Sequence, residues 1–256
     1  MLEIIETTKN KKYNYIKSLK QKKIRQTEHV YTVEGTKSVE DAINSGSEIC
    51  MIAMSQSYYG EYGSISESII VKDDLFSGLC DTKTPQGIIA VIRMKSTTDI
   101  KIDTDKLYIY CDNIQDPGNL GTIIRTADAA GFGGVLLSPG CADVYSPKTV
   151  RSSMGSFFNI DIVPEFEYSK LFQLKDKGMN LVCGALTDDA SSYLDADFKK
   201  PTIIKVGNEA NGVRTDILEN CNHIIIPIYG KAESLNVAVA ASILMYEARN
   251  QRRGKI

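Results

Sequence analysis

From residue 107 to the C-terminus, short apolar runs of strand length alternate with segments of helical length. The first of these runs, LYIYCDNI from Leu107 to Ile114, contains almost no polar residue until its end, which is typical of a parallel strand buried on both faces. Alternating strands and helices assemble into a mostly parallel sheet with helices on both sides. This region is therefore predicted to be an α/β domain.

A shorter alternation of the same kind occupies the first part of the chain, with strands expected at HVYTVEG, EICMIAMS, SIIVKDD and GIIAVIRM. It predicts a small α/β domain. The polar stretch 96–106 lacks periodicity and is interpreted as a linker. Three parts are expected: 1–95 with a basic N-terminal helix, the linker 96–106, and the larger domain 107–256.

Composition and charge exclude several classes of protein. The chain is 43% hydrophobic and 24% charged, and its net charge of −2 does not favour a general polyanion binder. No long apolar run precedes a small-residue cleavage site, and the run Val237–Tyr246 is too short to span a bilayer. We therefore expect a cytoplasmic protein without a membrane partner.

The cysteines do not form a metal-binding pattern. The six cysteines lie at least 30 residues apart, and the chain has only two histidines. Most of the cysteines stand beside apolar residues, so they are expected to be reduced and mostly buried. No metal is expected.

The N-terminal segment is strongly basic. Residues 9–26 have helical apolar spacing, and residues 1–26 carry eight basic side chains against two acidic ones. By itself this pattern fits either a solvated helix face or an arm that binds phosphate groups.

Three polar loops follow expected strands, and ligands of open parallel sheets bind beyond the carboxyl ends of the strands. In the first loop, DPGNLG does not have the glycine spacing of a dinucleotide-binding turn, which argues against a nicotinamide-dependent oxidoreductase. Asp116 and Asn119 are candidate helix caps. Arg125 lies in the otherwise small and apolar stretch TIIRTADAA, as an ion-pairing surface residue or a functional one.

The second loop follows the apolar strand IIKV and begins with Gly207, Asn208 and Glu209. Glu209 is interpreted either as a helix cap or as a group that positions a substrate. In the third loop, Ser234 is expected to cap the last helix, with Asn236 in its first turn. A polar amide among small apolar residues is costly there unless it is hydrogen-bonded.

Together these loops resemble the motifs of the SpoU family, also called the TrmH family, of RNA 2′-O-ribose methyltransferases. The first motif has an asparagine, a glycine two residues on and an arginine four after that, as do Asn119, Gly121 and Arg125. The third runs Ile-Pro-x-x-Gly and then Ser-Leu-Asn-Val, and IPIYGKAESLNVAVA matches each of those positions.

The second motif of that family is an apolar strand ending in Gly-x-Glu and followed by Gly, which Gly207, Glu209 and Gly212 match. The resemblance covers about 107–256. YTVEGTKSVEDAI and TPQGIIAVI resemble a substrate-binding domain often fused to this family, which is similar to the ribosomal protein L30e fold.

The resemblance implies a deep trefoil knot formed by residues near 180–240, and S-adenosylmethionine bound there mainly by backbone groups. It also implies a homodimer with the last helix in the interface, although periodicity alone equally fits a buried core helix of a monomer. The residues implied in cofactor binding are Ala185, Leu186, Thr187, Gly207, Asn208, Ile226, Ile228, Ser234 and Leu235.

The resemblance also implies catalytic roles. Arg125 acts on the ribose 2′-hydroxyl, either by shedding a proton in a desolvated pocket or by staying charged and clamping the RNA phosphate. Asn119 orients the hydroxyl or Arg125, and Glu209 steadies Asn119 or the RNA. Ser234 and Asn236 bind the reacting region and shape the cofactor loop.

In an RNA enzyme the basic N-terminal segment is more readily interpreted as an RNA arm. The residues expected to contact RNA are Lys20, Lys22, Lys23, Arg25, Lys148 and Arg151. Large-subunit (23S-type) ribosomal RNA is the preferred substrate, because the added N-terminal domain is commoner among the ribosomal RNA members of the family. A transfer RNA methyltransferase and a non-catalytic RNA-binding protein on the same scaffold are the alternatives, and DNA is not expected to bind.

Overall fold

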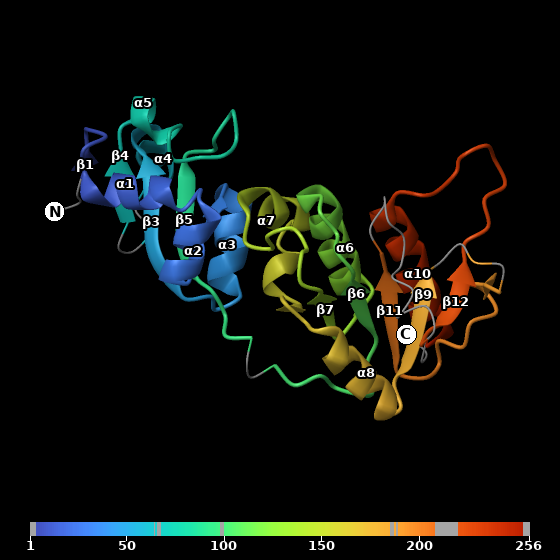
Figure 1. Cartoon of the computed structure of the whole chain (residues 1–256). Coiled ribbons are helices and arrows are strands. Elements are labelled where there is room, and N and C mark those ends of the chain that lie inside the picture. Colours follow the sequence, from blue (N-terminus) through green and yellow to red (C-terminus); the bar gives the residue numbers. More distant parts are fainter. Residues whose placement is uncertain are drawn as a thin grey trace. The chain divides into compact units, whose positions relative to one another are not determined.

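The computed structural model describes residues 4–63, 65, 68–97, 100–184, 187, 189–207 and 220–252 (Figure 1). The chain divides into two compact units, Met1–Lys95 with Tyr145–Phe158, and Ser96–Val144 with Asn159–Ile256. A segment in the middle of the expected larger domain therefore packs with the first unit. A domain that is continuous in the sequence can contribute a segment to the packing of its neighbour. The domain boundaries at residues 95 and 107 therefore stay a prediction.

The first unit contains a mixed five-stranded sheet in the order β1-β4-β3-β5-β2. The strands β1, β4 and β3 are parallel, whereas β5 runs antiparallel to both β3 and β2. Its strands are β1 (Ile4–Ile5), β2 (Val30–Glu34), β3 (Ile49–Ser55), β4 (Ser68–Val71) and β5 (Ile88–Arg93). Its helices are α1 (Lys11–Ser18), α2 (Lys22–Glu28), α3 (Thr36–Asn44), α4 (Gln56–Tyr62), α5 (Asp73–Phe76), α7 (Pro147–Ser153) and the 3₁₀ turn η1 (Ser156–Phe158).

The basic N-terminal segment differs from the single helix predicted over 9–26. It forms two helices, because Gln21 has extended backbone (φ −86°, ψ 125°) and interrupts the helical hydrogen bonding between α1 and α2. The apolar face predicted from periodicity is confirmed, since Tyr13, Ile16 and Leu19 are buried in the core of the unit.

The second unit contains a seven-stranded sheet in the order β10-β12-β9-β11-β6-β7-β8. Every pair of neighbouring strands is parallel, which confirms the sheet type predicted from the alternation. Its strands are β6 (Tyr108–Cys111), β7 (Gly134–Leu137), β8 (Asp161–Val163), β9 (Asn180–Gly184), β10 (Ser191–Ser192), β11 (Thr202–Val206) and β12 (Asn222–Ile225). Its helices are α6 (Pro117–Ala129), α8 (Tyr168–Asp176) and α10 (Val237–Gln251).

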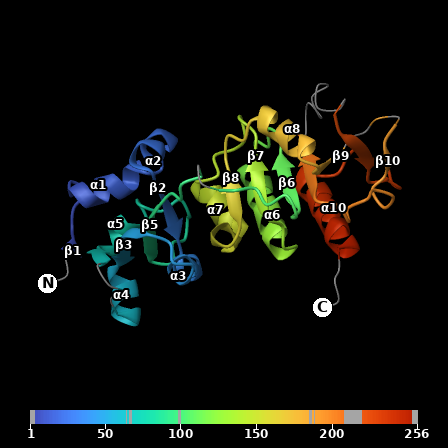
Figure 2. The same cartoon turned by 90° about the horizontal axis from the view of Figure 1, so that it is seen from below.

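Helices cover both faces of this sheet, with α8 on one side and α6 and α10 on the other (Figure 2). Leu171 and Leu174 of α8 pack on the face that carries Tyr110, Leu181 and Ile203. On the opposite face, α6 and α10 pack against each other, and α10 also contacts β11. The near-absence of polar residues in the strands is thus explained by burial on both sides.

All six cysteines are free. Cys80, Cys111 and Cys183 are buried, Cys141 and Cys221 are half-buried and Cys50 is exposed, so the expectation of burial is confirmed for three of the six and wrong for Cys50. Burial raises the pKa of the Cys80 thiol to about 12, with the neighbouring Glu34 adding to the effect. Among the described residues, no helix is long and apolar enough to cross a membrane.

Candidate functional site

The carboxyl ends of β6, β9, β11 and β12 lie at one edge of the second sheet, because these neighbouring strands are parallel. The three polar loops that the sequence singles out follow β6, β11 and β12. The end of β11 is joined to the loop after β6 by a hydrogen bond of 2.9 Å from the Asp112 N–H to the Val206 carbonyl. The parallel topology thus gathers loops that are far apart in the sequence.

The first motif lies at the N-terminus of α6. Asp116 is the N-cap, and its Oδ1 accepts a hydrogen bond of 2.8 Å from the Asn119 N–H. Pro117 occupies the first helical position, where a missing N–H costs nothing. The candidate cap Asp116 is therefore confirmed, and Asn119 lies within the first turn of the helix.

The third motif lies at the N-terminus of α10, but its cap is not the residue expected. Asn236 is the N-cap, and its Oδ1 accepts hydrogen bonds from the N–H groups of Ala238 (2.9 Å) and Val239 (3.3 Å). The prediction that Ser234 caps this helix is wrong, because the helix begins only at Val237 and Ser234 lies exposed in the preceding loop.

The two helix starts are joined by a direct hydrogen bond. The Asn236 Nδ2 donates to the Asn119 Oδ1 over 3.0 Å, while the other amide atom of Asn236 caps α10. Further along the same helix pair, the hydroxyls of Thr126 and Ser242 lie 3.2 Å apart. The sequence gives no sign of this second contact, since hydroxyls on small-residue helices are common and their pairing depends on how the helices pack.

Arg125 lies on α6, eight residues after the first helical residue, and its side chain is exposed. Long side chains on a helix generally lean toward its N-terminus, which for α6 is the end that carries Asn119. In the part of the chain that the structure describes, no acidic group lies within ion-pairing distance of Arg125. Arg125 thus has no ion-pair partner among the described residues, and both interpretations of its role stay predictions.

The residues implied in cofactor binding fall at the same sheet edge where they are described. Gly207 follows β11, and Ile226, Ile228 and Leu235 lie in the loop between β12 and α10 with their side chains partly exposed. Asn208 and Glu209 lie outside the described residues. So do Ala185 and Leu186.

Thr187 is described, and it lies beside a histidine that the sequence reading overlooked. His223 Nδ1 lies 3.3 Å from the Thr187 hydroxyl and 3.0 Å from both carboxylate oxygens of Asp189. The hydrogen bond to His223, followed by that to Thr187, lowers the pKa of Asp189. This cluster ties the segment after β9 to β12. The only signal in the sequence is that histidine is rare in this chain.

Two of the residues expected to contact RNA have structural roles. Arg25 is only 3% exposed, and its Nη1 donates to the carbonyls of Leu19 (2.6 Å) and Lys20 (2.8 Å). Lys20 is exposed, but its ammonium donates to the carbonyls of Gly78 (3.1 Å) and Cys80 (2.7 Å). Including Arg25 in an RNA-contacting surface is thus contradicted by its burial.

The other basic residues expected to bind RNA are exposed. Lys22 and Lys23 lie at the start of α2, and Lys148 and Arg151 lie on α7. Arg151 Nη1 lies 3.2 Å from Asp81 Oδ2, with both side chains 44% exposed, so water screens this ion pair and it is worth little. All four side chains are therefore accessible from solvent.

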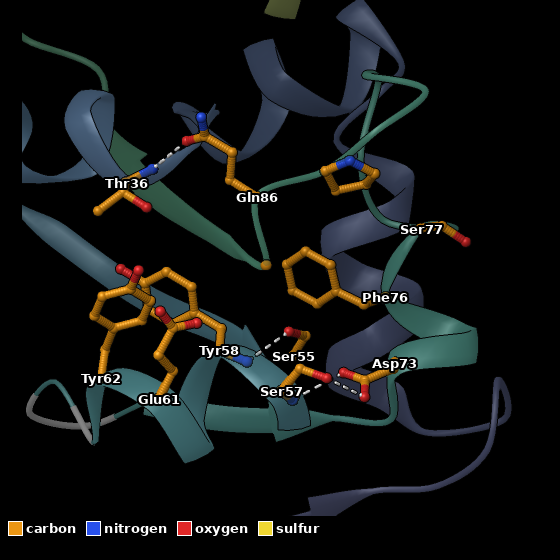
Figure 3. Close-up of a pocket in the computed structure, with 12 residues that line it drawn as sticks. Thr36, Ser55, Ser57, Tyr58, Glu61, Tyr62, Asp73, Phe76, Ser77 and Gln86 are labelled. Carbon is orange, nitrogen blue, oxygen red and sulfur yellow. Dashed lines mark hydrogen bonds between the residues drawn. The ribbon is translucent and has the colours of Figure 1, made fainter.

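The first unit also contains an open pocket of about 560 Å³ (Figure 3). Phe76 and Tyr58 contribute aromatic surface, and Asp73 lies at one side, where it accepts hydrogen bonds from the Ser57 N–H (3.0 Å) and hydroxyl (2.6 Å). These bonds lower the pKa of Asp73. Since the carboxylate is already bonded within the unit, we assign no catalytic role to this pocket.

Comparison with known proteins connects both units to one kind of enzyme. Residues 106–246 match the model of the SpoU rRNA Methylase family, and residues 10–90 match that of the MRM3-like substrate binding domain. The 23S rRNA (guanosine(2553)-2′-O)-methyltransferase RlmP of Bacillus subtilis is 38% identical over 248 residues, which cover 96% of this chain and 98% of that protein.

Solved structures agree with these matches. The AdoMet-bound rRNA methyltransferase from Sinorhizobium meliloti superposes with a TM-score of 0.88 at 30% identity, over 99% of both chains. The SpoU methyltransferase AviRb from Streptomyces viridochromogenes, in complex with the cofactor AdoMet, gives a TM-score of 0.84 at 28% identity, over 95% of this chain and 98% of that one. The resemblance seen in the three loops is confirmed, and the chain belongs to the SpoU rRNA methylase family, with an MRM3-like substrate-binding domain preceding the family domain.

Proposed function

We propose that this protein transfers a methyl group from S-adenosylmethionine to the 2′-hydroxyl of a ribose in RNA. The oxygen–carbon bond forms as the sulfur–carbon bond breaks, and the hydroxyl proton is released. The observation that carries the proposal is the 3.0 Å hydrogen bond between Asn236 and Asn119, which joins the first and third family motifs at the ligand-binding edge of the parallel sheet. Because a sulfonium is already a good leaving group, alignment of the reacting atoms is the main task of the enzyme.

The loops at this edge fit a cofactor held by backbone groups. The segment 226–235 forms the long loop between β12 and α10 (Figure 1). Within the described residues it makes no hydrogen bond, so its C=O groups, and its N–H groups except at Pro227, are available to a ligand. The partly exposed side chains of Ile226 and Ile228 offer apolar surface to an adenine ring. We propose that this loop, Thr187 and Gly207 bind S-adenosylmethionine together with Ala185, Leu186 and Asn208, and that Ser234 and Leu235 close the site.

We assign the catalytic roles as follows. Arg125 stays charged and clamps the RNA phosphate beside the target ribose, since its guanidinium is exposed and guanidinium groups remain protonated in proteins. Asn119, held by Asn236, orients the 2′-hydroxyl toward the methyl group. Ser234 binds the reacting region, and Glu209 steadies the RNA.

The proposed substrate is 23S-type ribosomal RNA. RlmP of Bacillus subtilis, named as a 23S rRNA methyltransferase, aligns with nearly the whole of both units, including the N-terminal one. A transfer RNA methyltransferase is the alternative substrate assignment. A non-catalytic RNA-binding protein is disfavoured, because such a protein has no need for an Asn119–Asn236 link beside an exposed arginine.

The experiment that tests this function uses S-adenosylmethionine with a labelled methyl group, mixed separately with unmodified ribosomal RNA and unmodified transfer RNA. We expect label in ribosomal RNA only, at an alkali-resistant linkage, as 2′-O-methylation requires. Label in transfer RNA only would overturn the substrate assignment. Cofactor binding without transfer to either RNA would indicate an assembly intermediate as acceptor, and neither binding nor transfer would indicate a non-catalytic RNA binder.

Replacing Asn236 with aspartate separates the two roles of this side chain. The aspartate retains the acceptor for the Ala238 and Val239 N–H groups but loses the donor to Asn119. A negative charge also suits a helix N-terminus, so the melting temperature should stay at the wild-type value or rise slightly. The rate constant for methyl transfer should fall about tenfold, the effect of one lost hydrogen bond.

The control is Asn236→Ala, which loses the cap as well and should lower the free energy of unfolding by about 1 kcal/mol. Single-turnover kinetics and thermal unfolding of both variants check the prediction. A wild-type rate in Asn236→Asp would contradict the proposed role of the Asn119–Asn236 link.

We further propose a homodimer with α10 in the interface. Val239 and Tyr246, seven residues apart on this helix, are 48% and 53% exposed, which leaves an apolar stripe available to a second copy.

The strand order of the second sheet supports the proposed trefoil knot, since β11 lies between β9 and β6 rather than beyond β9. The cytoplasm is the proposed location, in accord with the free cysteines.

A further inference from the structure

A lysine lies fully buried in the middle of the parallel sheet of the second unit. Lys205 on β11 is 0% exposed, and alternation along the strand places it on the same face as Ile203, which is the face covered by α8. In the sheet register its neighbours are Cys183 on β9 and Tyr110 on β6. Removing an ammonium group from water is costly, so this position requires a partner.

That partner is Asp112, the first residue after β6. The Lys205 Nζ lies 2.8 Å from the Asp112 Oδ2, and the two side chains are 0% and 5% exposed. The Asp112 Oδ1 accepts a hydrogen bond from the Tyr168 hydroxyl of α8. The Lys205 Nζ is close enough to the Asp112 Oδ2 for an ion pair, but the contact lacks the alignment of a hydrogen bond. Among the described residues, the buried Nζ therefore has no hydrogen-bond partner.

Such a pair is not explained by its effect on stability. Replacing a buried ion pair with apolar residues of similar size is often neutral or stabilising, whereas removing one partner leaves an uncompensated buried charge. The surrounding face is apolar and aromatic, and it would accommodate an apolar side chain at both positions. We therefore look for the role of this ion pair in the segments whose positions it fixes.

The pair connects the ends of the two strands that lead into the proposed active site. Asp112 is followed by the loop into α6, which carries Asn119 and Arg125, and Lys205 is followed closely by Gly207. The hydrogen bond from the Asp112 N–H to the Val206 carbonyl joins the same two strand ends. Opposite charges 2.8 Å apart attract each other strongly in a buried site, which favours one separation of these two strand ends.

We propose that Asp112 and Lys205 are positioning residues, which set the spacing of the carboxyl ends of β6 and β11 and thereby place Asn119 and Arg125 against the cofactor loops. The effect on methyl transfer rests on the proposed function. The effect on the spacing of the two strand ends can be measured without any enzyme activity. The amide of Asp112 reports on that spacing directly, because it is the donor of the bond to Val206.

The test compares Lys205→Met, Asp112→Asn and the double variant in the full-length protein. Each single variant leaves one charge buried alone, so its melting temperature should fall by about 10 °C. The double variant has no lone charge, and its asparagine can still accept from Tyr168, so its melting temperature should return to near the wild-type value. Its rate constant for methyl transfer should nevertheless stay about 10- to 100-fold below that of wild type.

Two further measurements keep the outcome decisive. Leu174→Ala, in the same α8-covered core, should lower the melting temperature but leave the rate constant within about twofold of wild type, which separates loss of stability from loss of alignment. The protection factor of the amide at position 112, which corrects for the intrinsic exchange rate of each residue type, should be lower in the double variant than in wild type. Wild-type exchange there, or a wild-type rate in the double variant, would overturn the inference. If wild-type protein methylates no RNA, the proposed function fails, and the exchange measurement still decides on the positioning role.

Discussion

Replacing Arg125 with alanine lowers the rate constant for methyl transfer by about 10²- to 10³-fold, the usual effect of removing one charged group that acts in the transition state. The melting temperature should not change, because Arg125 is exposed and has no acidic group within ion-pairing distance among the described residues. The affinity for S-adenosylmethionine should also stay at the wild-type value, since the proposed clamp acts on the RNA phosphate.

Arg125→Lys is the matched control for charge. A lysine retains the positive charge but cannot bind a phosphate through two parallel N–H groups. If Arg125 acts as a clamp, Arg125→Lys should bind RNA more tightly than Arg125→Ala, while most of the rate remains lost. Single-turnover kinetics with labelled S-adenosylmethionine measure the rate, and filter binding measures the affinity. Recovery of the full rate with lysine, or an unchanged rate with alanine, would contradict the assignment.

Replacing Arg25 with methionine should lower the free energy of unfolding by about 2–4 kcal/mol, because the carbonyls of Leu19 and Lys20 lose a buried charged donor. The effect should be confined to the first unit, where these groups hold the turn between α1 and α2. Chemical denaturation followed by circular dichroism measures the change. RNA binding by the folded protein should remain, since the Arg25 side chain is only 3% exposed.

The matched variant is Lys22→Gln with Lys23→Gln, which removes two exposed charges from the same helix. Its stability should equal that of wild type, while its RNA affinity falls and the slope of log K against log salt becomes less steep by about 1.5. If Arg25→Met bound RNA more weakly at wild-type stability, Arg25 would be an RNA-binding residue and its assigned structural role would be wrong. An unchanged salt slope in the lysine variant would exclude α2 from the RNA-binding surface.

The sequence predicted helix and strand types well where the apolar pattern was strong, as in the strands β6 and β11 and the helix α10. It was less accurate at element ends. The N-terminal helix is interrupted at Gln21, and the last helix is capped by Asn236 rather than Ser234. Both serine and asparagine are good caps, and which one is used depends on where the chain leaves the sheet.

The sequence by itself determined the parallel α/β sheet and the positions of the three loops, because local periodicity and loop chemistry depend only on neighbouring residues. The fold decided which distant groups meet. Asn236 contacts Asn119, and Lys205 pairs with Asp112, because parallel strands bring their carboxyl ends to one edge. Arg25 was predicted to be a surface charge because composition does not reveal burial, whereas in the fold its guanidinium donates to the carbonyls of Leu19 and Lys20 in the turn between α1 and α2.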